Sequence, residues 1–119
     1  MRLAAGLAML LAAPLRAEDC GAPLAVAETH RAAALAATRG RAPLRRDYPD
    51  CPPLGANVTE WRDARGVLRR AALQAGGDDS AFTAETYFDD AGRPRFAFVS
   101  GGAVSGARLT QRIAIGADG

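Results

Sequence analysis

The sequence predicts an α+β fold in which one N-terminal helix packs on a five-stranded antiparallel meander sheet, with one disulfide bond. Three observations support this prediction. An alanine-rich stretch follows Pro23, a turn motif with aspartate and glycine recurs in the second half of the chain, and two cysteines flank the alanine-rich stretch. A chain of 119 residues suffices for one small domain.

The first seventeen residues, MRLAAGLAMLLAAPLRA, have the order of a secretory signal peptide: Arg2, an apolar run over residues 3–13, and a small residue, Ala17, at the cleavage position. The apolar run is shorter than the ~20 residues that span a bilayer as a helix. Two acidic residues precede Cys20, whereas a lipoprotein signal has small or apolar residues there. We therefore expect an exported bacterial protein, periplasmic or secreted, without a membrane anchor after cleavage. Its mature part is one domain of residues 18–119.

The charge balance of the mature domain is close to neutral. All 15 basic residues are arginines, and the chain has 13 acidic residues. Because Arg2 and Arg16 belong to the signal peptide, 13 arginines face 13 acids in the mature part. Polyanions require a cationic surface, so we expect neither nucleic-acid binding nor general binding to anionic membranes.

Cys20 and Cys51 both lie in the mature part. In an exported chain an even pair of cysteines predicts one disulfide bond. The bond closes a loop of about 32 residues and contributes roughly 3–4 kcal/mol. That contribution is large for a domain with so small a core.

The helix is expected at about residues 22–39. Pro23 suits the first helical position, alanine has the highest helix propensity, and Gly40 suits the residue that ends a helix. Small side chains allow close packing, so we expect the helix to contact the sheet through its alanines. The next stretch, RAPLRRDYPDCPPLG, has four prolines and is expected to be an irregular, extended connection.

A hairpin motif recurs in the second half of the chain. WRDARGVLRRAAL aligns with YFDDAGRPRFAFV at an offset of 26 residues, and a weaker third copy is IAIGADG. The shared turn residues of the first two copies are Asp63, Gly66, Asp89 and Gly92. Aspartate bonds its own backbone in a turn, and glycine supplies a positive φ. Each copy therefore predicts two antiparallel strands joined by a turn.

The motif predicts a meander over about residues 57–115. The five strands are expected at about 57–63, 67–74, 82–89, 94–100 and 107–115. The stretches AGGDDSA and GGAVSGA are expected to be longer loops. Alternation of Phe96 and Phe98 in the fourth strand, and of Leu109 and Ile113 in the fifth, indicates one buried face.

The adjacent acids Asp89 and Asp90 are more consistent with a turn than with a metal site. A calcium loop needs oxygen ligands at alternating positions and a closing acid. Ala91 stands where a third ligand would be, and no glutamate follows at the required distance. We therefore expect no metal and no cofactor.

His30 is the only histidine of the chain. A catalytic histidine needs a nucleophile and an orienting acid. None of the serines at 80, 100 and 105 stands in a G-x-S-x-G motif. We expect no enzymatic activity, and the alternative is a small hydrolase that uses His30.

The glycine-rich stretch SGGAVSGAR, residues 100–108, is a candidate binding loop. It lacks the lysine and the following helix of a phosphate-binding loop. Loops held by a rigid sheet often mediate recognition, so the predicted binding residues are Ser105, Gly106 and Arg108. Residues 105–108 resemble the Ser-Gly-x-basic loop that periplasmic lysozyme inhibitors insert into the enzyme cleft, which implies a periplasmic enzyme inhibitor. That family is all-β and has an aromatic residue where Leu109 stands.

The segment FDDAGR, residues 88–93, resembles the Tyr-Asp-x-x-Gly-Arg core of RHS/YD-type and MORN-like hairpin repeats in bacterial secreted and surface proteins. Phe88 stands for the tyrosine, and Pro94 follows where an apolar strand residue is usual. The resemblance implies a hairpin scaffold for interaction. We therefore expect a non-enzymatic binding or structural domain whose partner is an unknown protein or envelope component.

Overall fold

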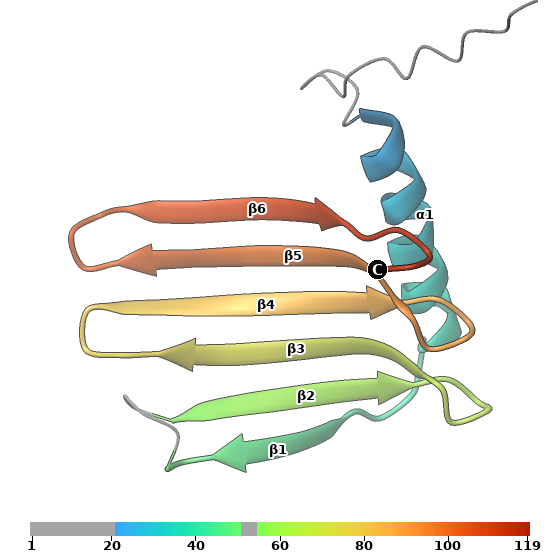
Figure 1. Ribbon diagram of the computed structural model, residues 1–119. Helices are drawn as coiled ribbons and strands as arrows, with labels where there is room; N and C mark the ends of the chain where they lie inside the picture. The colour runs from blue at the N-terminus through green and yellow to red at the C-terminus, as the bar shows by residue number, and fades with distance from the viewer. Residues whose placement is uncertain (1–20, 51–54) are drawn as a thin grey trace, which may run out of the picture.

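Figure 1 shows the computed structural model, which describes residues 21–50 and 55–119. The elements in chain order are α1 (Gly21–Ala37), β1 (Leu44–Tyr48), β2 (Ala56–Arg62), β3 (Leu68–Gly76), β4 (Ser80–Phe88), β5 (Pro94–Ala103) and β6 (Arg108–Ala114). The strands form one antiparallel sheet in the order β1-β2-β3-β4-β5-β6. The predicted α+β fold, a helix on an antiparallel meander, is therefore confirmed. The predicted signal peptide, residues 1–17, and the predicted Cys20–Cys51 disulfide lie outside the described residues.

The prediction of five strands is wrong, because the proline-rich connection contains β1. This strand pairs with β2 from Leu44 opposite Glu60 to Tyr48 opposite Ala56. Prolines precede and follow it, and all five of its residues are exposed. An edge strand held mainly by backbone pairing needs no buried side chains, so β1 has no hydrophobic alternation that the sequence could reveal.

The two glycine-rich connections are shorter than predicted, because their glycines continue the strands. β3 runs on to Gly76 and β5 to Ala103. Gly101 lies opposite Phe82 in the ladder between β4 and β5. A Cβ atom at Gly101 would lie 3.0 Å from Cβ of Phe82 and 2.8 Å from a backbone oxygen of β4. Glycine is needed here for close approach within a strand, not for flexibility in a loop.

The helix lies against the strands at one end of the sheet, as Figure 1 shows. Its buried residues are Ala27 and Ala34, seven positions and thus about two turns apart. They pack with Tyr87 of β4 and Phe96 of β5, whose ring centroids are 5.9 Å apart. The prediction that α1 contacts the sheet through its alanines is confirmed.

The hairpin turns after β2 and β4 have the same hydrogen bonds. In each, the aspartate Oδ1 accepts from the backbone N–H groups two and four residues later, at 2.9 and 3.0 Å for Asp63 and at 3.0 Å twice for Asp89. Gly66 and Gly92 donate to the carbonyls of these aspartates at 3.0 Å, with φ of 83° and 80°. Local bonds thus set both turns, which lie at the same end of the sheet as α1 (Figure 1).

Candidate functional site

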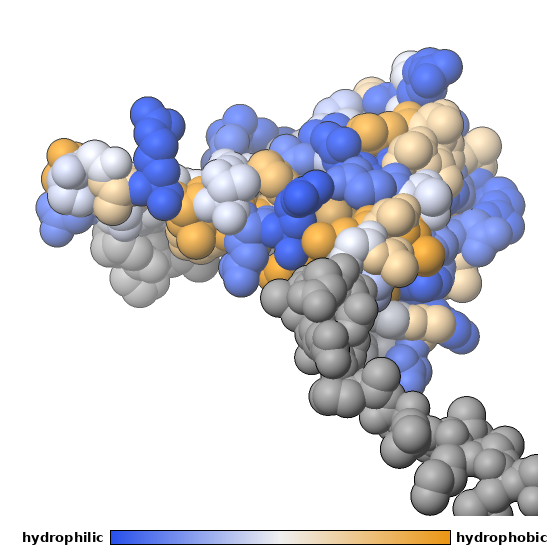
Figure 2. All heavy atoms as spheres, turned by 90° about the horizontal axis from the view of Figure 1, so that it is seen from above, coloured by the Kyte–Doolittle hydropathy of each residue, from blue (hydrophilic) through white to orange (hydrophobic). Residues whose placement is uncertain are grey.

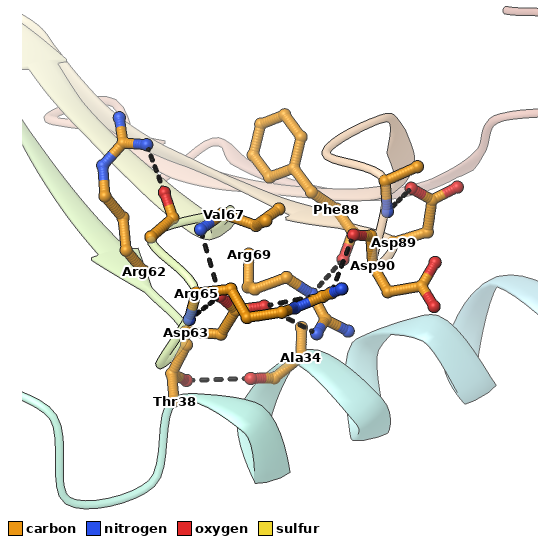
Figure 3. A network of polar contacts seen from close by, with 12 residues as sticks. Ala34, Thr38, Arg62, Asp63, Arg65, Val67, Arg69, Phe88, Asp89 and Asp90 are labelled. Carbon is orange, nitrogen blue, oxygen red and sulfur yellow. Dashed lines mark hydrogen bonds and ion pairs between the residues drawn. The ribbon is translucent and has the colours of Figure 1, made fainter.

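A buried ion pair extends the first of these turns into the core, as Figure 3 shows. Oδ2 of Asp63 lies 3.5 Å from Nη1 of Arg69 and 3.7 Å from Nη2 of Arg65. The Nε–H of Arg69 donates to the carbonyl of Phe88 at 3.1 Å. The first turn is thereby bonded to the end of the next hairpin.

The second turn repeats this arrangement. Oδ2 of Asp89 lies 3.5 Å from Nη1 of Arg95, and Nε–H of Arg95 donates to the carbonyl of Ile115 at 3.1 Å. The carbonyl of Asp90 accepts from Arg65 at 3.1 Å, while its side chain is exposed. No group of three or more His, Cys, Asp or Glu side chains that could hold a metal is found within residues 21–50 and 55–119. The two aspartates therefore act in the structure as turn and ion-pair residues.

These contacts alter the acidity of both aspartates. Burial alone would raise the pKa of Asp63, but hydrogen bonds from the N–H groups of Val67 and Arg65 and the charges of the two arginines hold the pKa below its ordinary value. The pKa of Asp89 is lowered in the same way, against the effect of burial, by two backbone N–H groups and by Arg95. Both carboxyls are thus kept ionised and are poorly suited to donate a proton.

A second polar cluster lies beside α1 on the side of the sheet that the helix covers. The guanidinium of Arg70 lies between two aromatic rings, 4.1 Å from the centroid of Trp61 and 5.7 Å from that of Tyr87. The Tyr87 hydroxyl donates to Oε2 of Glu85, which also lies 3.5 Å from Nη2 of Arg70. Burial and the neighbouring Glu85 raise the pKa of Tyr87 despite the opposing effect of Arg31 and Arg70. This cluster therefore lies at the contact between α1 and the sheet.

The structure separates the predicted binding residues. Ser105 and Gly106 lie in the tight turn between β5 and β6, where Ser105 Oγ accepts from the N–H of Ala107 at 3.4 Å. Gly106 has a φ of 91° and donates to the carbonyl of Ala103 at 2.9 Å. Arg108 instead begins β6 and lines a depression on the sheet. Ser105 and Gly106 thus stabilise the turn, and of the three residues only Arg108 lines the depression.

His30 lies half-buried on α1. The described residues contain no hydrogen bond to its side chain. Ser80 begins β4 and Ser105 lies in the turn after β5, both at the end of the sheet away from α1 (Figure 1). The structure therefore does not bring His30 together with these serines.

Beyond α1, the helix-covered side of the sheet is open and polar. A depression of about 830 Å³ extends across all six strands there. One row of consecutive cross-strand partners runs along its floor: Asp47, Asn57, Gln74, Thr83, Ser100 and Thr110. In Figure 2 this part of the molecule is thin, because the sheet continues where the helix does not.

The opposite side of the sheet is apolar and uncovered by any described element. Side chains alternate along a strand outside the bulges next to Trp61 and Tyr87, so residues in the regular ladder an odd number of positions from Tyr87 or Phe96 point away from α1. We call this surface the apolar side. Its outward-pointing residues include Leu44, Tyr48, Val58, Leu73, Phe82, Val99, Leu109 and Ile113. Five of the larger ones (Leu44, Tyr48, Phe82, Leu109 and Ile113) are between 38 and 52 % exposed.

The prediction that one face of the sheet buries the apolar residues of both β5 and β6 is wrong. The alternation predicts Phe96, Leu109 and Ile113 on one buried face, whereas the ladder pairs Phe96 with Ala114 and Leu109 with Gly101. Phe96 therefore faces α1, and Leu109 and Ile113 face away from it. The alternation in β6 was a correct signal for a strand, but only the register with β5 assigns its side.

The chain matches no protein-family model, no curated protein and no solved structure. Among the described residues, no helix has the length and hydropathy needed to cross a membrane. The function is therefore inferred from the chain's own surfaces.

Proposed function

We propose that the mature chain is an exported, non-enzymatic domain that binds a protein partner through the apolar side of its sheet. The observation that supports this is the gathering of exposed Leu44, Tyr48, Phe82, Leu109 and Ile113 on one side of one sheet. The largest apolar patch on a soluble monomer is often functional. Such surfaces usually mark an interface.

The size and charge of the apolar side fit a protein partner. Six strands about 4.8 Å apart make a surface about 24 Å wide, and about six residues of each strand make it about 20 Å long. The whole face, polar residues included, thus has a footprint of ~500 Å², which is comparable with the largest surface patches of single-chain proteins. Its charged residues lie together at the corner formed by β1 and β2: Arg46, Glu60 and Arg62, whose guanidinium lies 3.1 Å from the Glu60 carboxylate. A polyanion would need several cations, so the fitting partner is a largely apolar protein surface with charges only at that corner.

Adjacent residues of β3 provide a matched test, because Leu73 points to the apolar side and Gln74 to the helix-covered side. The purified mature domain, Leu73→Lys and Gln74→Lys are used to capture cross-linked partners from a cell-envelope extract. We expect wild type and Gln74→Lys to capture the same protein and Leu73→Lys to lose it, with both variants folded by circular dichroism. Equal capture by the two variants would contradict the proposal.

A second candidate is a periplasmic enzyme inhibitor that inserts the β5–β6 turn into an enzyme cleft. It is favoured by Val104, which is 81 % exposed at the tip of this turn, next to Ser105. Lysozyme activity measured with the purified domain tests it. Inhibition by wild type that is lost in Val104→Asp would support this candidate, and the absence of inhibition would remove it.

A further inference from the structure

The two edges of the sheet differ in their protection against further strand pairing. β1 has five residues and is bounded by Pro43 and Pro49. Short edge strands and prolines are two ways in which proteins block pairing with another chain. β6 has seven residues and no proline, and six of the seven are exposed. No described element pairs with its outer side. Arg108 and Arg112 put charge on this edge, but β6 lacks the proline and the short length of β1, so its edge is the less protected of the two.

The backbone groups of alternate β6 residues face this open edge. The N–H of Ile115 donates to the carbonyl of Arg95 at 3.0 Å, and the carbonyl of Ala107 accepts from Ala103 at 2.9 Å. Odd-numbered residues between these positions therefore bond to β5, since antiparallel ladders alternate residue by residue. The even-numbered residues direct their N–H and C=O groups outward. These residues are Arg108, Thr110, Arg112 and Ala114.

Among the symmetric antiparallel pairings of β6 with itself that use at least five of its seven residues, charge favours one register. A two-fold axis at Gln111 sets Arg108 opposite Ala114 of the partner subunit. It also sets Thr110 opposite the partner's Arg112, so no like charges lie directly opposite. An axis at Thr110 would set Arg108 against Arg112, and one at Arg112 would set this residue against itself. Like charges directly opposite are destabilising.

We propose that two copies of this chain pair through β6 in the Gln111 register. Every outward-facing backbone group of β6 is then hydrogen-bonded across the axis. On the apolar side, Leu109 lies opposite Ile113 of the partner subunit, which makes the apolar sides of the two sheets continuous. On the other side, Glu28 lies 3.8 Å from Arg112 and offsets the charge of the two Arg112 side chains near the axis.

The position of α1 is compatible with this pairing. Figure 1 shows that the N-terminal end of α1 projects past β6. The two-fold axis places both helices on the same side of the joined sheet, at opposite ends of the strands. The projecting end of each helix then lies toward the partner's polar depression, which Arg108 and Thr110 line. In the dimer, the helix end of each subunit thus lies near the part of the partner's sheet that the partner's own helix does not cover.

Substitutions at Thr110 test the register by sedimentation velocity over a range of concentrations of the mature protein. Thr110→Glu sets opposite charges across the axis in both halves of the dimer, and Thr110→Arg sets like charges. We expect the dimer dissociation constant to fall with Thr110→Glu and to rise with Thr110→Arg, each by roughly 2- to 30-fold. Thr59→Glu and Thr59→Arg introduce the same charges on β2, far from the edge and outside the depression, and should leave the constant unchanged.

A cysteine variant tests the position of the two-fold axis independently. Two Cα atoms in a non-hydrogen-bonded antiparallel pair are about 4.5 Å apart, within the reach of a disulfide. Gln111→Cys should therefore form a covalent dimer on oxidation, whereas Leu109→Cys and wild type should not. A wild type that stays monomeric at every concentration overturns the proposal. A dimer that is weakened by Leu73→Lys but unchanged in both Thr110 variants forms through the apolar side and also overturns it.

Discussion

Asp63 and Arg69 form a buried ion pair, with side chains 7 and 8 % exposed and a distance of 3.5 Å between Oδ2 and Nη1. The equivalent pair, Asp89 and Arg95, has the same distance with side chains 14 and 17 % exposed. In each hairpin a single aspartate accepts the hydrogen bonds of the turn through Oδ1 and pairs with the arginine through Oδ2. A motif of Asp-x-x-Gly-x-x-Arg thus specifies both a turn and a contact across the sheet.

Replacing Asp63 by asparagine tests how much the negative charge of Asp63 contributes to stability, because the substitution removes only that charge. Asparagine keeps an oxygen acceptor for the two backbone N–H groups of the turn but leaves the buried guanidinium of Arg69 without a counter-ion. We expect Asp63→Asn to lower the melting temperature by on the order of 10 °C. Asp89→Asn, whose ion pair is more exposed, should lower it less. Thermal unfolding followed by circular dichroism measures both, and a larger effect at Asp89 would contradict the assignment.

The lowered pKa values of Asp63 and Asp89 predict acid sensitivity. A carboxyl with a lower pKa in the folded state stabilises the fold above its unfolded pKa and loses this contribution as pH falls through the folded pKa. The melting temperature should therefore fall as the pH drops below about 4. The double variant Asp63→Asn, Asp89→Asn should lose less over the same pH range. Parallel acid curves for wild type and double variant would refute this explanation.

Gly101 and Gly102, which are adjacent in β5, are expected to differ in how well they tolerate replacement by alanine. A Cβ at Gly101 meets backbone oxygen at 2.8 Å and Cβ of Phe82 at 3.0 Å, whereas one at Gly102 meets its nearest atom at 3.6 Å. We expect Gly101→Ala to destabilise the domain by about 1–3 kcal/mol, the usual cost of overpacking. Gly102→Ala should be neutral or slightly stabilising, because alanine restricts the unfolded chain. Urea unfolding of the two variants decides this, and similar midpoints would sink the idea that Gly101 is required for packing.

The predicted Cys20–Cys51 disulfide is open to a direct test. Reductant should lower the melting temperature of residues 18–119, with a loss of roughly 3–4 kcal/mol of stability from the freed loop. Cys20→Ser and Cys51→Ser should each match the reduced wild type and should not respond to reductant. An unchanged melting temperature in wild type would show that the two cysteines are not paired.

The helix and the hairpin turns could be predicted because their determinants are close in sequence. Pro23, the alanines and Gly40 favour a helix through local propensity, and the observed helix ends within a few residues of the predicted bounds. Asp63 and Gly66 specify a turn through bonds that span only four residues. The strand β1 could not be predicted in this way, because its residues are exposed and its only strong signal, flanking proline, is also typical of loops.

By itself, the sequence determined the local structure of this protein: a helix, a series of Asp-x-x-Gly hairpins and therefore an antiparallel meander. Only the tertiary structure decided which side of the sheet α1 covers. Both sides carry apolar residues, and a shift of one residue in register exchanges them. The choice depends on contacts summed over four strands, with Tyr87 and Phe96 under Ala27 and Ala34. Leu109 and Ile113 are left exposed on the other side for this reason.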